Sequence, residues 1–236
     1  MHELTESDIL EAWGRGLGQS RIEQALALIA AADVERSFAQ LASLPIGRRD
    51  TLLLDLRQRL FGPTCDCVVA CQACGEALEI TFGLDEIRAP PAAPPAVLAV
   101  EVDGGVVHAR LPNSYDLLAA RACGDRTSAR LCLLGRCLDA DPRGLPPETV
   151  EVIAAHMAAA DPQANVEIML ECLGCRCEWP APFDIAAFLW AEVDAWARRT
   201  LREVHMLARA YGWREADVLA LTAQRRQIYL DMLADE

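Results

Sequence analysis

Two Cys-x-x-Cys pairs, Cys71/Cys74 and Cys172/Cys175, constrain the fold of this chain more than any other feature. Each pair interrupts strand-like sequence, with VVA before and ALEITF after the first, and VEIMLE before and Glu178-Trp179 after the second. A turn with this spacing presents two sulfurs to one side, and two such hairpins facing each other form a zinc ribbon. The pattern therefore predicts one Zn²⁺ held by four thiolates from two distant turns.

Three further cysteines leave the ligand set open. Cys65 and Cys67 precede the first pair and Cys177 follows the second, so each could replace a predicted ligand, form a second partial site or remain free. A redox Cys-x-x-Cys pair usually starts a helix, which lowers the thiol pKa, and neither pair here begins a periodic helix. Disulfides are the weaker expectation, because the acidic, polar start MHELTESDIL is no export signal.

Composition narrows the function classes. The formal charge of −13 opposes attraction to nucleic acid or anionic lipid, although all 22 basic residues are arginine. No stretch approaches the ~18–20 apolar residues of a spanning helix, so we expect a soluble cytoplasmic protein that is not bound to a membrane. The chain contains no H-E-x-x-H, G-x-x-x-x-G-K or G-x-S-x-G motif. Because four thiolates also leave no open coordination position, we expect no catalytic residues and no enzyme.

Helical periodicity dominates outside the two hairpins. Helices are predicted over residues 5–13, 21–32, 34–44, 50–61, 114–123, 129–138, 147–159, 185–210, 214–221 and 223–233. Residues 97–111 predict a hairpin that turns at Asp103-Gly104, and APPAAPP, over residues 89–95, predicts a stiff connector.

The predicted fold is therefore mainly α, with a small β zinc ribbon that is split by an inserted α+β segment, and with a long C-terminal helix. Residues 1–62 form a helical module, 63–88 and 165–183 the ribbon, 89–164 the insertion, and 184–236 a helical docking arm.

The predicted docking arm combines aromatic and arginine side chains, which protein interfaces favour. The residues expected to bind a partner are Trp190, Trp213, Tyr229, Arg225 and Arg226. The same aromatic side chains could instead pack only against the long helix. Short helices with arginines would also suit a helix-turn-helix regulator that binds nucleic acid, although the total charge opposes that interpretation.

Long stretches between about Leu44 and Tyr229 resemble a known family. CQACGEALEI, RLPNSYDLLAA and PAPFDIAAFLWAEVDAWARRTLREVHMLARAYGWREADVLAL are similar to T4-like bacteriophage baseplate hub assembly proteins of contractile tails and contractile injection particles. The resemblance implies a non-enzymatic role in building the baseplate by docking to other baseplate or tail proteins. It implies that assembly takes place in the bacterial host cytoplasm. It does not decide whether the chain is a chaperone that dissociates or a component that stays in the virion or injection particle.

Relatives of this family typically carry Cys-Pro-x-Cys-Gly at each knuckle. That motif maps onto Cys71, Cys74 and Gly75, and onto Cys172 and Cys175. Both prolines are absent here, and the sequence Arg176-Cys177 stands where the second knuckle would have its glycine.

Overall fold

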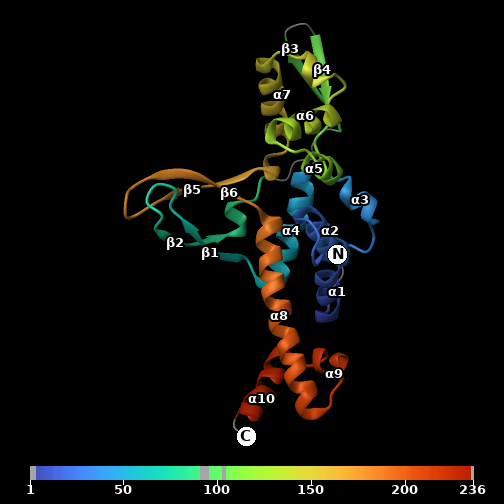
Figure 1. Cartoon of the computed structure of the whole chain (residues 1–236), viewed down its shortest axis with the longest axis vertical. Coiled ribbons are helices and arrows are strands. Elements are labelled where there is room, and N and C mark those ends of the chain that lie inside the picture. Colours follow the sequence, from blue (N-terminus) through green and yellow to red (C-terminus); the bar gives the residue numbers. More distant parts are fainter. Residues whose placement is uncertain (1–3, 91–95, 103–104, 235–236) are drawn as a thin grey trace. The chain divides into compact units, whose positions relative to one another are not determined.

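The structure, a computed structural model, describes residues 4–90, 96–102 and 105–234. Helices predominate, and the strands form three two-stranded antiparallel sheets (Figure 1). The longest helix, α8 (Ile185–Tyr211), has 27 residues and lies near the C-terminus. The mainly helical class, the small sheets and the long late helix are thereby confirmed. Within the described ranges, none of the helices has the length and apolar character needed to cross a membrane.

The chain divides into two compact units that group the predicted modules differently. One unit joins the residues up to 35 with those from 186 onward, and the other holds residues 36–185. Residues 36–62 therefore belong with the hairpins and the insertion, whereas the sequence had placed them with the N-terminal helices.

Capped helices build the first unit. The first two helices each begin with a capping box, formed by Thr5 with Asp8 and by Ser20 with Glu23. Each box satisfies backbone N–H groups at the N-terminus of its helix. With α8, the helices of this unit are α1 (Glu6–Gly16), α2 (Arg21–Ala32), α9 (Glu215–Leu219) and α10 (Ala223–Ala234). The helix predicted over residues 5–13 extends to Gly16, so Gly14 and Gly16 lie inside α1.

Two contacts fasten α1 to α8. The indole N–H of Trp13 donates to Asp194 Oδ1 at 2.8 Å. One turn away, the Trp190 ring fills the space beside Gly16, where an added Cβ would clash with the Trp190 ring atoms Cη2 and Cζ3. The packing of α1 against α8, two helices far apart in the sequence, therefore depends on Gly16 having no side chain.

The second unit contains all the strands. Its elements are α3 (Phe38–Ala42), α4 (Ile46–Phe61), β1 (Thr64–Ala70), β2 (Ala77–Gly83), η1 (Leu84–Glu86), β3 (Leu98–Val102), β4 (Gly105–Ala109), α5 (Ser114–Arg121), α6 (Arg126–Cys137), η2 (Pro142–Gly144), α7 (Pro147–Ala160), η3 (Pro162–Ala164), β5 (Val166–Glu171) and β6 (Glu178–Phe183). The helix predicted over 34–44 is shorter than expected, because Ser37 caps it. The next helix begins four residues early, since Pro45 occupies its N-cap and a proline there costs no helical hydrogen bond.

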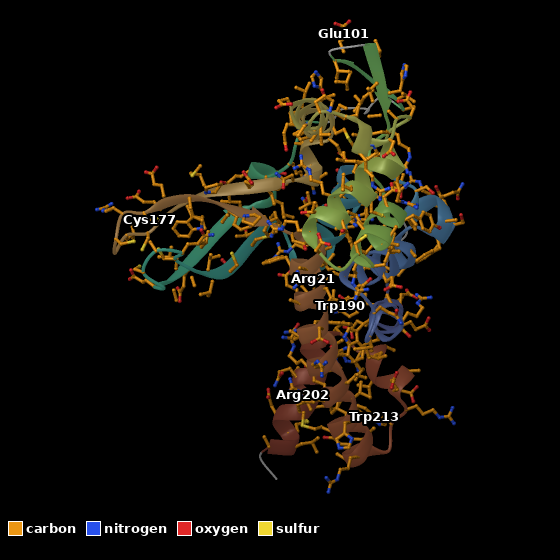
Figure 2. All side chains as sticks on the ribbon, turned by 45° about the horizontal axis from the view of Figure 1, so that its top comes forward. Arg21, Glu101, Cys177, Trp190, Arg202 and Trp213 are labelled. Carbon is orange, nitrogen blue, oxygen red and sulfur yellow. The ribbon has the colours of Figure 1, made fainter. Side chains whose placement is uncertain are left out.

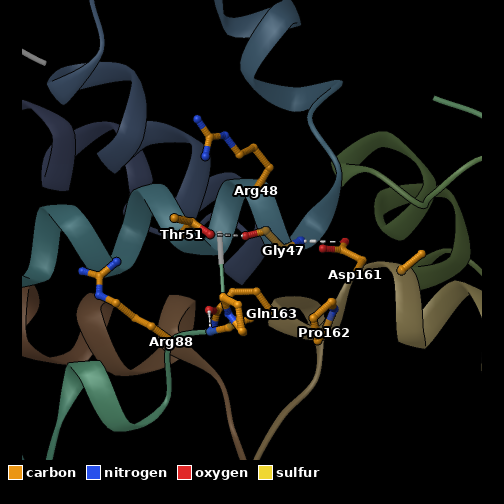
Figure 3. A pocket seen from close by; sticks show the side chains of 10 residues that line it. Gly47, Arg48, Thr51, Arg88, Asp161, Pro162 and Gln163 are labelled. Carbon is orange, nitrogen blue, oxygen red and sulfur yellow. Dashed lines mark hydrogen bonds between the residues drawn. The ribbon is translucent and has the colours of Figure 1, made fainter. Parts of the chain in front are cut away.

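The insertion begins and ends at one junction within the second unit. Gln163 accepts from the Ala89 amide at 2.7 Å and donates to the Ile87 carbonyl at 3.2 Å, so the two ends of the segment meet. Next to this junction, the Gly47 amide donates to Asp161 Oδ2 at 2.9 Å (Figure 3). Between these ends, β3, β4, α6 and α7 share their own apolar cluster, which includes Val100 and Ile153. The predicted Asp103-Gly104 turn and residues 91–95 of the connector lie outside the described residues.

The contact between Gly16 and Trp190 gives a matched pair of substitutions within one helix. Gly16→Ala should lower the free energy of unfolding by about 1–3 kcal/mol, because the methyl group overpacks the indole. Gly14→Ala should raise it by about 0.5–1 kcal/mol, since Gly14 has open space around it and alanine favours the helix. Urea denaturation followed by circular dichroism measures both, and equal effects would show that Trp190 does not pack on Gly16.

Candidate metal centre

Two β-hairpins lie side by side in the second unit (Figure 1). In the first, β1 pairs with β2 up to Ala70 opposite Ala77, and in the second, β5 pairs with β6 up to Glu171 opposite Glu178. The Phe82 and Phe183 rings meet edge to face at 5.3 Å, at the end of the hairpins away from the turns. The buried side chains between the hairpins and near the turns are Leu170, Trp179, Cys71 and Cys172.

The two turns repeat one hydrogen-bond pattern. In the first, the Cys71 amide donates to the Glu76 carbonyl at 2.8 Å and the Gly75 amide donates to the Cys71 carbonyl at 2.9 Å. In the second, the Cys172 amide donates to the Cys177 carbonyl at 2.9 Å and the Arg176 amide donates to the Cys172 carbonyl at 2.7 Å. Each turn therefore holds its two cysteines in the same way.

These turns bring the four predicted ligand sulfurs together, and we call them the four-cysteine cluster. The Sγ atoms of Cys71, Cys74, Cys172 and Cys175 all lie within 4.8 Å of one another. Two separations between the hairpins, Cys71 to Cys175 and Cys74 to Cys172, are 3.7 Å. Four sulfurs at about 2.3 Å from a tetrahedral Zn²⁺ stand roughly 3.8 Å apart, so the spacing suits such an ion. It is far longer than a disulfide bond of about 2.05 Å.

Backbone dipoles favour the thiolate form at one of the four cysteines. The Cys74 amide points at the sulfur of Cys71 and lowers the pKa of the Cys71 thiol to about 6, from an ordinary 9.0. Backbone amides also point at Cys74, Cys172 and Cys175, but the neighbouring sulfurs and burial raise the pKa of these three thiols. Thiolates are the form that binds metal, so Cys71 is the ligand most readily deprotonated. A carboxylate lies close by, with Glu76 Oε2 3.5 Å from Cys172 Sγ. The negative charge of Glu76 beside the sulfurs further favours the binding of a cation.

The three alternative cysteines do not join the cluster. Cys65 and Cys67 lie within β1, opposite Phe82 and Ile80 in register and away from the turn, and neither belongs to the cluster. Cys177 contributes its carbonyl to the second turn, while its thiol lies 3.9 Å from the Glu178 carbonyl oxygen. Among the described residues, the four-cysteine cluster is the one group of three or more potential metal ligands.

The aromatic residues predicted to bind a partner are partly used inside the first unit. Trp190 is half-buried on Gly16, as described above. Trp213 and Tyr229 pack against the buried Leu207 and Val218, and their rings meet edge to face at 4.9 Å. Figure 2 shows Trp190 and Trp213 on the helical part of the chain. Both Trp213 and Tyr229 keep part of their surface exposed.

The two arginines of the predicted docking set differ. Arg225 is exposed in the first turn of α10, where its amide donates to Thr222 Oγ1 at 3.3 Å. Arg226 is only 2% exposed, and its guanidinium pairs with Glu6 at 2.8 Å and Glu203 at 3.0 Å. The prediction that Arg226 is a surface anchor is therefore wrong. It binds α10 to α1 and α8, a role that sequence spacing could not reveal because Glu6 lies at the opposite end of the chain.

A pocket beside the junction of the insertion offers no comparable chemistry. Its polar groups hold the fold, since Asp161 accepts from Gly47, and Gln163 bonds the backbone on both sides of Arg88 (Figure 3). Arg88 itself donates to Asp55 at 2.8 Å and to Gln58 at 3.0 Å. The four-cysteine cluster is thus the better candidate for a functional site.

Comparison with known proteins adds no relative, because no family model, curated protein or solved structure matches the chain.

If the four-cysteine cluster holds zinc, removing one ligand should release the metal and destabilise the second unit. We expect Cys74→Ser and Cys175→Ser to lose bound zinc and several kcal/mol of stability, because the binding free energy of a structural zinc adds to folding. Cys67→Ser is the matched control, since Cys67 lies on the same hairpin outside the cluster. Mass spectrometry of metal content and thermal melting measure these effects. Full zinc content in either ligand variant would contradict the assignment.

The second turn carries backbone strain that the first avoids. Gly75 and Arg176 hold equivalent positions with φ of 77° and 60°, and the left-handed region is costly for any residue with a Cβ. Arg176→Gly should therefore stabilise the zinc-loaded protein by about 0.5–1 kcal/mol, and Gly75→Ala should destabilise it by about 1 kcal/mol. Melting temperatures at equal zinc content test the pair, and a lower value for Arg176→Gly would refute the strain.

Proposed function

We propose that this chain is a non-enzymatic, zinc-stabilised assembly protein of a contractile-tail baseplate, and that it acts by docking to other baseplate or tail proteins. The four-cysteine cluster carries the structural half of this proposal. The resemblance of the sequence to baseplate hub assembly proteins supports the biological half.

The paired hairpins are proposed to be a zinc ribbon that is split by the insertion. Four thiolates complete the tetrahedral coordination that Zn²⁺ prefers, so water has no position at which the metal could activate it. The turns belong to sheets of only two strands, which are marginally stable in isolation. A cation between the turns would join the hairpins at the end opposite the Phe82–Phe183 contact.

A docking role is further supported by the surface of the first unit. Tyr211, which is 39% exposed, stacks on Trp213 at 4.8 Å and meets Tyr229 at 5.8 Å. Aromatic side chains that are held rigid yet remain partly exposed lose little conformational entropy on binding, and interfaces are enriched in them. Arg225 lies exposed on α10, the helix that carries Tyr229.

Measurements of metal content and of reactive thiols together test the proposed zinc site of the four-cysteine cluster. The purified native protein should contain one zinc per chain, and a chelator should release it while four thiols become reactive. A metal-free protein with an oxidised Cys-x-x-Cys pair would instead indicate thiol redox chemistry. Retention on DNA that weakens with salt would indicate a regulator that binds nucleic acid.

A deletion tests the assembly role. In a bacterium that produces the contractile particle, loss of this chain should leave tails without complete baseplates in electron micrographs. The wild-type chain and the Arg176→Gly control should restore them, and Cys74→Ser should not. Normal particles from the deletion strain would overturn the proposal. Immunodetection in purified particles then distinguishes a component that stays from a chaperone that leaves in the host cytoplasm.

A further inference from the structure

One face of α8 concentrates positive charge in an otherwise acidic protein. Between positions 195 and 210 the exposed side chains include no carboxylate. They are Ala195, Arg198, Arg199, Arg202, His205, Met206, Arg209 and Ala210. Figure 2 shows Arg202 on this part of the helix. The chain as a whole carries 35 acidic residues against 22 arginines, so a face of this composition departs from the average surface.

Three of these arginines lack an internal counter-ion. The carboxylates of the same helix segment are already engaged, since Asp194 accepts from Arg198 at 2.8 Å and Glu203 accepts from the buried Arg226 at 3.0 Å. Among the described residues, no ion pair joins Arg199, Arg202 or Arg209 to a carboxylate. Arg209 lies in the last turn, where the helix dipole favours a cation, but Arg199 and Arg202 lie in the middle of the helix and gain nothing from the dipole.

The spacing of this face is that of a helix-packing surface. Ala195, Arg199, Arg202, Met206 and Arg209 follow steps of four, three, four and three, the heptad pattern that keeps one side of a helix against a partner helix. Met206 is 47% exposed and offers an adaptable apolar contact in the middle of the stripe. We call these five residues the basic stripe.

We propose that the basic stripe of α8 is the docking surface for an acidic amphipathic helix of another protein. Carboxylates of that helix at matching heptad positions pair with Arg199, Arg202 and Arg209, and an apolar side chain packs on Met206. Arginine suits this role because its planar guanidinium binds a carboxylate through two parallel hydrogen bonds. The inference rests on the proposed docking function and names the partner chemistry for it.

Two other occupants fit less well. Ala195 and Met206 of the stripe offer neither a hydrogen-bond donor nor a positive charge to a phosphate backbone, so nucleic acid would use only the three arginines. The described part of a second copy of the chain offers no complementary helix. Within the described ranges, no helix exposes three carboxylates at heptad spacing, and Glu6 of α1 is taken by Arg226.

A pair of synthetic peptides tests the stripe on the full-length, zinc-loaded protein. One peptide, about three heptads long, carries glutamates at the a and d positions with a leucine to meet Met206. The second has the same composition, with the glutamates moved off that face. Fluorescence anisotropy at physiological salt should show the patterned peptide binding at least about tenfold more tightly, because only it aligns three ion pairs.

A matched set of variants locates the binding. The triple variant Arg199→Gln, Arg202→Gln, Arg209→Gln should weaken binding of the patterned peptide about tenfold. The control Arg59→Gln, Arg126→Gln, Arg143→Gln makes the same charge change at exposed arginines of the other unit and should leave binding unchanged. Circular dichroism and zinc content verify that both variants fold.

Four results would overturn the assignment. Two are equal affinity for both peptides and equal loss in both triple variants. The other two are tighter binding of duplex DNA, and self-association in sedimentation, where the stripe variant abolishes it. None of them bears on whether deletion of the chain blocks baseplate assembly, so the two proposals fail independently.

Discussion

Coordination of one cation by four sulfurs is the interaction on which the proposed architecture of the second unit depends. The paired hairpins bury few large side chains near their turns, chiefly Leu170 and Trp179. Such a small core cannot offset the conformational entropy of ordering the hairpins. A structural zinc contributes about 10–16 kcal/mol of apparent binding free energy, which is available only when the four ligands are in place. Zinc bound at the four-cysteine cluster would therefore make the turns and the insertion between them one cooperative unit.

The location of the insertion follows from this arrangement. Gln163, near the end of the insertion, bonds to the backbone of Ile87 and Ala89 at its start, so the chain leaves and returns at one junction. The inserted segment has an apolar cluster of its own, around Val100 and Ile153. Long insertions are tolerated where their ends meet, because closure entropy grows slowly with length. Two cysteine pairs far apart in sequence can thus still serve one site.

Much of this could be predicted from local sequence, because local rules govern it. The cysteine spacing identified all four sulfurs, and alternation identified the strands around them. The start of α4 lies four residues before the predicted start at residue 50, because Pro45 stands at the N-cap of the helix. Arg226 was misplaced for a different reason. Whether an arginine is buried depends on its partners, and Glu6 and Glu203 reach it only through the tertiary fold.

The charge of the whole chain is a poor guide to what one surface can bind. At physiological ionic strength electrostatic attraction decays over about 8 Å, so a partner responds to the side chains within that distance and not to the total of −13. On α8 the local carboxylates are occupied, which leaves Arg199 and Arg202 facing solvent with their charge uncompensated. The spacing of three and four was present in the sequence, but the spacing alone does not separate a core stripe from a surface stripe. Burial on the opposite side of the helix, at Leu189, Val193 and Ala197, makes that distinction, and assigns the arginines to the side where a partner can reach them.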